Sequence, residues 1–331
     1  MKRLSLLLIL IALNPIARAQ NIEELAASPC KSIRGLSVVN DRIAWASGTQ
    51  GYVGITKDGG DHWAWAQVPG MDTLDFRDIE AFSDQKAVIM SSGTPAVILT
   101  TENGGKSWEK RYFSNKPEIF LDEMDFADEK TGTILGDPVN GKFLLMNTLD
   151  GGKTWTEANA PEAQEGEACF AASGTGIRYT GKNRIAFATG GSVARVFIGD
   201  GKKWIVKTVP VVQGKGSQGI FSFATQQDEW LFVGGDYIQP NAREKAGVRI
   251  SGLLKNAPEI AASPVNGYRS CVEFLGVKKA LATGPGGTEL STDGGKSWKK
   301  LGENGYHVCR KAKKSKLVLL AGSGKLARYT E

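Results

Sequence analysis

The chain of 331 residues has few of the side chains that usually build metal and redox sites. It has only two histidines, His62 and His307. It has only four cysteines, Cys30, Cys169, Cys271 and Cys309. No two cysteines form a CxxC pair, so neither a zinc motif nor a haem-attachment motif is present. No GxGxxG stretch opens a helical pattern, which leaves no dinucleotide-binding signature. We therefore expect neither a metal nor a cofactor.

Long apolar runs are also missing after the first nineteen residues. The positively charged start Met1–Arg3 precedes an apolar run at 4–13, and "ARA" ends at Ala19, which together predict a signal peptide cleaved after Ala19. The apolar run is about half as long as a membrane-spanning helix requires. The residue directly after the cleavage point is Gln20 and not a cysteine, so we expect no lipid anchor. The sequence predicts a periplasmic or secreted protein that does not span a membrane.

An excess of charge of one sign is missing as well. The chain carries 41 basic and 35 acidic residues, and removal of Lys2, Arg3 and Arg18 leaves 38 against 35, a net charge of +3. One basic cluster remains, "CRKAKKSK" at 309–316. A nucleic-acid site is one interpretation of it, but no aromatic residues are interleaved with the charges. We favour a solvated hairpin, and expect no nucleic-acid partner.

What the sequence does contain is a repeat. Four similar stretches, "TKDGGDHW", "TENGGKSW", "TLDGGKTW" and "STDGGKSW", end at Trp63, Trp108, Trp155 and Trp298, and a degenerate copy ends at Trp204. Independently, seven short apolar runs each end in a glycine, at spacings of 38 to 54 residues. Both series indicate a unit of about 47 residues that reads as short strands separated by turns, with no helical period.

This unit has the size of a four-stranded β-propeller blade. The sequence therefore predicts an all-β fold, a single seven-bladed propeller over residues 20–331. The last unit has room for only three strands. Because an open edge strand invites aggregation, we expect residues 22–30 to supply the missing outer strand of the seventh blade.

The repeated stretch has the pattern Ser/Thr-x-Asp-x-Gly-x-Ser/Thr-Trp, with Asn103 replacing the aspartate once. A short side chain that binds nearby backbone, followed by glycines, is typical of a tight turn, and the tryptophan then covers it. These stretches resemble the Asp-box, or bacterial neuraminidase repeat, of sialidases and other propellers. The resemblance implies a structural role for the eight residues Asp58, Trp63, Asn103, Trp108, Asp150, Trp155, Asp293 and Trp298.

In a propeller, two kinds of connection share one face. One kind joins the outer strand of a blade to the inner strand of the next blade, and the other joins the second strand of a blade to its third. We expect a binding site for a protein, a peptide or an anionic ligand there, because guanidinium groups bind carboxylates and phosphates bidentately. The alternative is that these side chains form ion pairs between blades. The predicted site residues are Arg34, Arg77, Asp78, Asp122, Glu123, Asp137, Glu167, Asp236, Tyr237, Tyr268, Arg269 and His307.

The cysteines leave several interpretations open. "YRSC" and "YHVC" place Cys271 and Cys309 at matching positions of adjacent blades. Cys309 with His307 would form a nucleophile pair, although a buried structural cysteine is the more common case. A disulfide needs Cα atoms within about 7 Å, which the sequence does not establish. We predict no catalytic residue from this pattern.

Over nearly the whole mature chain the sequence resembles the exported propellers of the photosystem II assembly and stability factor family. The shared features are the signal peptide, seven short blades, the "DGGKTW"-type boxes and arginines at the starts of the inner strands. The resemblance implies a non-enzymatic protein that binds a protein or peptide during assembly, and we expect it to be a monomer.

The enzymatic alternative is a sialidase-like glycosidase. Arg34, Arg77 and Arg269 would then bind the substrate carboxylate, Tyr268 or Tyr237 would act as nucleophile with Glu167, and Asp78 as the acid. Against it, "SIRGL" lacks the proline of the sialidase Arg-Ile-Pro motif, and sialidases usually have six blades.

Overall fold

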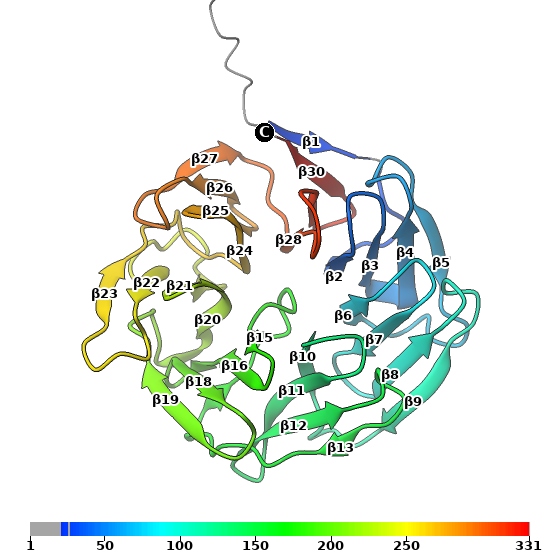
Figure 1. The fold of residues 1–331 in the computed structure, drawn as a ribbon, viewed down its shortest axis with the longest axis horizontal. Coiled ribbons are helices and arrows are strands. Elements are labelled where there is room, and N and C mark those ends of the chain that lie inside the picture. Colours follow the sequence, from blue (N-terminus) through cyan, green and yellow to red (C-terminus); the bar gives the residue numbers. More distant parts are fainter. Residues whose placement is uncertain (1–20, 26, 331) are drawn as a thin grey trace, which may run out of the picture.

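The computed structural model describes residues 21–25 and 27–330, which form seven blades around a central axis (Figure 1). The only helical element among these residues is the 3-10 turn η1 (Thr49–Gly51). None of the described helices is long and apolar enough to cross a bilayer. The all-β, seven-bladed propeller predicted from the repeat is confirmed. The predicted signal peptide, 1–19, lies outside the described residues.

The first three blades are antiparallel sheets of four strands, numbered from the axis outward. Blade 1 contains β2 (Ile33–Val38), β3 (Ala44–Gly48), β4 (Tyr52–Thr56) and β5 (Ala64–Gln67). Blade 2 contains β6 (Phe76–Ala81), β7 (Ala87–Ser91), β8 (Ala96–Thr101) and β9 (Glu109–Ser114). Blade 3 contains β10 (Leu121–Phe126), β11 (Gly132–Val139), β12 (Lys142–Thr148) and β13 (Thr156–Glu157).

The remaining blades follow the same order. Blade 4 contains β15 (Ile177–Gly181), β16 (Arg184–Ala188), β18 (Arg195–Gly199) and β19 (Trp204–Thr208). Blade 5 contains β20 (Lys215–Gln226), β21 (Glu229–Asp236), β22 (Gly247–Ser251) and β23 (Glu259–Ala262). Blade 6 contains β24 (Cys271–Gly276), β25 (Lys279–Gly284), β26 (Gly287–Ser291) and β27 (Lys299–Gly302). Blade 7 contains β28 (Val308–Lys311), β29 (Val318–Ala321) and β30 (Leu326–Thr330).

Two short strands depart from the predicted pattern. The strands β14 (Glu167–Ala168) and β17 (Gly190–Gly191) extend the sheet of blade 5 to six strands, because β17 pairs with the long strand β20. The inner strand of blade 4 is therefore β15. Glu167 lies in β14 and does not open this inner strand, since the residues between β14 and β15 form a loop at the axis.

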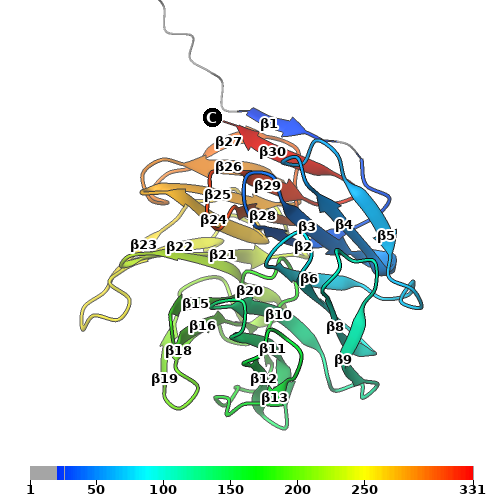
Figure 2. The same cartoon turned by 45° about the vertical axis from the view of Figure 1, so that its right-hand side comes forward.

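The ring closes as expected. The strand β1 (Asn21–Glu24) pairs antiparallel with β30 and becomes the outer strand of blade 7, and the two lie side by side in Figure 1 and Figure 2. Ile22 and Leu25 pack against the core that blades 6, 7 and 1 share. Because hydrogen bonds and apolar contacts join the first described strand to the last, the prediction of an N-terminal closing strand is confirmed.

Burial follows position within a blade. The middle strands β3, β7 and β8 are buried at every residue, because each blade is covered on both faces by its neighbours. This explains why they read as continuous apolar runs rather than as alternating strands. The outermost strands β5 and β19 are largely exposed.

The four boxes share one hydrogen-bond pattern. In blade 1 the Thr56 hydroxyl donates to Asp58 (2.9 Å) and accepts from the amide of Gly60 (3.0 Å), while Asp58 accepts from the amide of His62 (3.0 Å). The same three bonds occur in the boxes of blades 2, 3 and 6. The bond from His62 leads the interactions that lower the pKa of Asp58 to about 2. Each box is a self-contained turn.

Each box also contacts the preceding blade through its second glycine. A Cβ atom on Gly295 would lie 2.3 Å from Leu231 of blade 5, and one on Gly105 would lie 3.4 Å from Trp45 of blade 1. The tryptophans strengthen two of these contacts. Trp298 donates to Ser263 of blade 5 (2.8 Å), and Trp108 meets Trp45 edge to face. The boxes therefore pack blades together, on the face opposite the predicted site.

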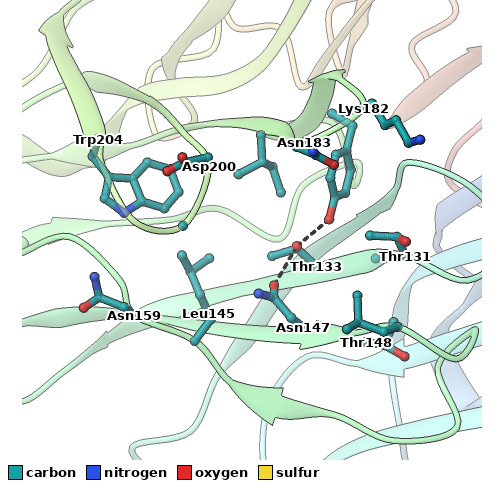
Figure 3. A pocket seen from close by; sticks show the side chains of 16 residues that line it. Thr131, Thr133, Leu145, Asn147, Thr148, Asn159, Lys182, Asn183, Asp200 and Trp204 are labelled. Atoms are coloured by element: carbon teal, nitrogen blue, oxygen red, sulfur yellow. Dashed lines mark hydrogen bonds between the residues drawn. The ribbon is translucent and has the colours of Figure 1, made fainter.

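Blade 4 shows what happens when a box is shortened. Trp204 follows Asp200 by four residues, against five in the full boxes, so the second glycine is missing. A cavity of about 220 Å³ lies at this position between blades 3 and 4, lined by Trp204, Asp200 and Asn147 among others (Figure 3). Thr133 spans its wall through hydrogen bonds to Asn147 (2.8 Å) and Tyr179 (2.9 Å). The indole nitrogen of Trp204 is buried and has no partner among the described residues.

The two glycines of one box provide a matched test of this packing. Gly294 and Gly295 both have positive φ (79° and 86°), but only Gly295 contacts another blade. We expect Gly294→Ala to cost about 1 kcal/mol from backbone strain alone. Gly295→Ala should cost roughly 1–3 kcal/mol more, because its methyl group overlaps Leu231. Urea denaturation of both variants measures the difference, and equal losses would contradict an interblade role for the second glycine.

Candidate functional site

A cavity of about 520 Å³ opens on the face opposite the boxes, above the axis of the propeller. Blades 1, 2, 3, 5, 6 and 7 all contribute residues to its wall. Seven of the twelve predicted site residues line it: Arg34, Arg77, Asp122, Asp137, Tyr237, Tyr268 and His307. The structure thus brings together side chains that are up to 273 residues apart in the sequence.

Most of these side chains owe their position to a β-bulge. In blades 1, 2, 3 and 5 the register between the first and second strands shifts at one residue, so that Arg34, Arg77, Asp122 and Phe221 have no partner in the ladder. A bulge turns its side chain away from the regular alternation. All four side chains line the cavity. In blades 6 and 7 the residues just before the inner strands, Ser270 and His307, line it too.

One side of the cavity is cationic. Arg34 donates to the carbonyl of Ala172 (3.2 Å), and Arg77 forms an ion pair with Asp75 (2.8 Å). None of the ion pairs in the described part of the chain involves Arg34. Burial, and then the charge of Arg77, lower the pKa of Arg34 from its usual value. A half-buried guanidinium group without a carboxylate partner is a binding group for an anion.

His307 lies on the same side but is uncharged at neutral pH. Burial, followed by the charges of Arg34 and Arg77, lowers its pKa to about 4. Its Nε2 atom lies 3.2 Å from the hydroxyl of Ser323. His307 therefore offers a neutral imidazole to a ligand.

The other side of the cavity is aromatic. The rings of Phe170 and Phe221 stack at 3.9 Å, and Tyr268 and Tyr237 meet the edge of Phe221 at 4.8 and 6.1 Å. Tyr237 and the next residue, Ile238, are exposed at the rim, to 51% and 70%. The sequence did not predict Phe170, Phe221 or Ser270, because an apolar or small residue at the start of a strand carries no signal of function.

The floor of the cavity is a loop formed by residues 169–176, which we call the plug loop and which lies near the centre of the ring in Figure 1. It contacts blades on several sides. The Ser173 hydroxyl donates to the carbonyl of Ser270 (2.7 Å), and Arg310 donates to the carbonyl of Gly174 (2.5 Å). Gly174 has a φ of +64°, and a Cβ atom there would lie 2.4 Å from Asp78. Only glycine satisfies both conditions.

Asp78 and Glu123 lie against the plug loop and are fully buried. Asp78 accepts hydrogen bonds from the amides of Ile79 (2.8 Å) and Met124 (2.7 Å). Burial raises its pKa to about 7, although Arg310 opposes this shift. Burial and the charge of Asp78 raise the pKa of Glu123 well above its usual value. The structure thus places these two predicted site residues within the core and not in the wall of the cavity.

Three further predicted residues have partners elsewhere. Glu167 forms an ion pair with Arg195, and Asp236 accepts from Gln218 (3.0 Å). Arg269 is fully buried and pairs with Glu289 (3.0 Å). In the observed register Ser270, not Arg269, is equivalent to Arg34, since Cys271 pairs with Thr283 as Gly35 pairs with Ser47. Arg269 occupies the position that is apolar in blades 1, 2 and 3, and its side chain is buried in the protein.

The cysteines are all buried thiols. The sulfur atoms of Cys271 and Cys309 lie 3.6 Å apart, so these two residues are neighbours as their matching sequence positions indicate. Within the described residues, the hydrogen bonds of Cys309 go to Cys271 and to the carbonyl of Leu281, and none joins it to His307. The geometry gives no support to a Cys–His nucleophile.

The buried Asp78 predicts a pH dependence of stability. Its pKa is about 7 in the folded protein and near 4 when unfolded, so the folded state holds a proton that the unfolded state loses. Stability should therefore fall as pH rises from about 4 to 7. The melting temperature should be higher at pH 5.5 than at pH 8, and Asp78→Asn should reduce that difference. Asp58→Asn is the control, because blade 2 already has Asn103 in this position. An unchanged difference in Asp78→Asn would contradict the role assigned to this carboxyl.

Comparison with known proteins agrees with the resemblance. The model of the family described as photosynthesis system II assembly factor YCF48 matches residues 19–118, about the first third of the chain. No curated protein sequence matches significantly. Among solved structures, YCF48 from Cyanidioschyzon merolae superposes with a TM-score of 0.68 at 15% identity, covering 93% of this chain and 98% of that one.

Two further structures show the breadth of the fold. "YCF48 bound to D1 peptide" superposes with a TM-score of 0.66 at 14% identity, covering 96% of this chain and all of that one. The WD40 propeller domain of Doa1 superposes with a TM-score of 0.65 at 11% identity, covering 94% of this chain and 97% of that one. At such low identities these superpositions establish the fold alone. Together with the family match, they confirm that this chain is a propeller similar to the photosystem II assembly factor YCF48.

Proposed function

We propose that this chain is an exported, monomeric, non-enzymatic propeller that binds a carboxylate-bearing segment of a protein partner in the cavity. The observation that carries the proposal is Arg34, a half-buried cation with no carboxylate partner among the described residues. Arg77 lies on the same side of the cavity. A carboxylate bound there would replace the water that burial has removed from Arg34.

The shape of the cavity favours an extended peptide. Its cationic side, from blades 1 and 2, faces an aromatic side from blades 5 and 6, so that one segment would present a carboxylate and an apolar side chain together. Exposed Tyr237 and Ile238 extend the apolar side beyond the rim. The solved structure titled "YCF48 bound to D1 peptide" supports this choice, because a propeller of the same fold holds a peptide.

The sialidase-like alternative has less support. Arg269 is paired with Glu289, and Glu167 with Arg195, so neither is available for the roles that the alternative requires. Burial raises the pKa of Tyr268 well above its usual value, which opposes its use as a nucleophile. Turnover of a fluorogenic sialoside by the purified protein would contradict the non-enzymatic proposal.

A photo-cross-linking experiment tests the binding site. A benzophenone amino acid at the rim position Tyr237 should capture a defined partner in the cell envelope, identified by mass spectrometry. Arg34→Gln with Arg77→Gln should reduce capture at least about tenfold, equivalent to about 1.4 kcal/mol, because two charge-assisted bonds are lost. The unfolding temperature of the double variant is measured alongside.

Matched controls lie on the opposite face. Arg42→Gln removes the same charge from an exposed turn, where Arg42 donates to the carbonyl of Lys57 (3.3 Å), and should leave capture unchanged. The cross-linker at Leu149, which is 76% exposed, should not capture the same partner. Equal capture from Leu149, or full capture by the double arginine variant, would refute the site.

The proposed export has its own test. The mature protein should begin at Gln20, as N-terminal sequencing of the protein from its host would show, and a version without residues 2–19 should remain in the cytosol. A protein from the host that still carries residues 1–19 would contradict this part of the proposal. It would leave the proposal of the binding site unaffected.

A further inference from the structure

Three potential metal ligands meet at the edge of the cavity. Asp122, Asp137 and Cys169 each direct one ligand atom into a cluster whose atoms all lie within 4.8 Å of one another. They come from β10, β11 and the start of the plug loop. Asp122 is 1% exposed and Cys169 is 5% exposed. Two carboxylates and a thiol in a buried cluster repel one another when ionised, and a bound cation removes that repulsion.

A backbone amide interacts with each carboxylate. Asp137 accepts through Oδ1 from the amide of Cys169 (2.9 Å), which holds the plug loop and the β11 side chain together. Asp122 has a backbone hydrogen bond with Ala171. The Oδ2 atom of Asp122 is buried and has no hydrogen-bond partner among the described residues. A buried carboxylate oxygen that nothing satisfies is costly, which indicates a missing ligand.

Both aspartates also occupy bulges. The register of β10 with β11 shifts at Asp122, and the register of β11 with β12 shifts at Asp137. Bulges redirect side chains and are common beside functional sites. The two bulges turn both carboxylates toward Cys169, so the cluster arises from the backbone of blade 3 and not from chance placement of long side chains.

The donor set indicates which metal fits. Magnesium and calcium take oxygen ligands and not thiolates, whereas zinc accepts carboxylate and thiolate together. Ligand atoms around a tetrahedral zinc are roughly 3.4–3.6 Å apart, given Zn–O near 2.1 Å and Zn–S near 2.3 Å. Because the three ligand atoms all lie within 4.8 Å of one another, zinc binding requires each pair to approach by at most about 1 Å.

We propose that Asp122, Asp137 and Cys169 form a zinc site whose fourth coordination position is open to the cavity. Three protein ligands and one exchangeable position are typical of zinc sites that interact with a ligand. The proposal does not depend on the peptide-binding function. No sequence pattern indicated this site, because its ligands are 15 and 32 residues apart and form no metal-binding motif.

Metal titration of the reduced, chelator-treated full chain tests the site. Isothermal titration with Zn²⁺ should give one site per chain. Co²⁺ should give a thiolate charge-transfer band that Zn²⁺ then abolishes. Cys169→Ala should eliminate the band, and Asp137→Asn should weaken zinc binding by more than the roughly 10–100-fold expected for an outer-shell partner. Asparagine keeps the acceptor for the Cys169 amide, so Asp137→Asn preserves the loop contact.

Cys271→Ala is the matched control. It removes a buried thiol outside the proposed site, where Cys271 lies beside the sulfur of Cys309. This variant should leave the Co²⁺ band and the zinc affinity unchanged. Circular dichroism and melting curves of the metal-free variants verify folding, and Asp137→Asn, which is less buried, carries the test if Cys169→Ala does not fold. Absence of one-to-one zinc binding by the parent chain, or loss of the band in Cys271→Ala instead, would overturn the proposal.

Discussion

The cavity depends on how the inner strand of each blade begins to pair with the second strand. In blades 1, 2, 3 and 5 one residue bulges out of the ladder, and the side chains at these bulges are Arg34, Arg77, Asp122 and Phe221. A regular ladder would send alternate side chains into the two blade-to-blade interfaces. The bulge adds a third direction, toward the axis, without disturbing the apolar contacts on either side. One backbone device therefore separates the residues that pack the ring from those available to a ligand.

The fold was readable from the sequence because its signals are local. The box from Thr148 to Trp155 forms its own hydrogen bonds within eight residues, so it keeps the same form wherever it occurs and counts the blades reliably. The closing strand could also be predicted by counting strands, because only three strands fit after Tyr306. These local signals fail in blade 4. Its box lacks a residue, and its inner strand, β15, starts after a glycine-rich loop that has no equivalent in the other blades.

The site was only partly readable because it depends on register and on distant contacts. Arg34 and Arg269 both precede small residues in similar strings, but a shift of one residue sends Arg269 into the core against Glu289. The plug loop contacts Arg34, Ser270 and Arg310, which are distant in the sequence, and no local pattern predicts that a loop will cross the axis. Asp78 does not line the cavity, because the plug loop buries it.

The uneven distribution of charge around the cavity connects the proposed peptide site with the proposed zinc site. Arg34 and Arg77 would attract a carboxylate, whereas ionised Asp122 and Asp137 on the neighbouring blade would repel it. A zinc ion held by these residues and Cys169 would offset that charge and offer its open position to the same carboxylate. The acidic wall would then attract the ligand that it otherwise opposes, so zinc and an acidic peptide should each increase the affinity of the chain for the other.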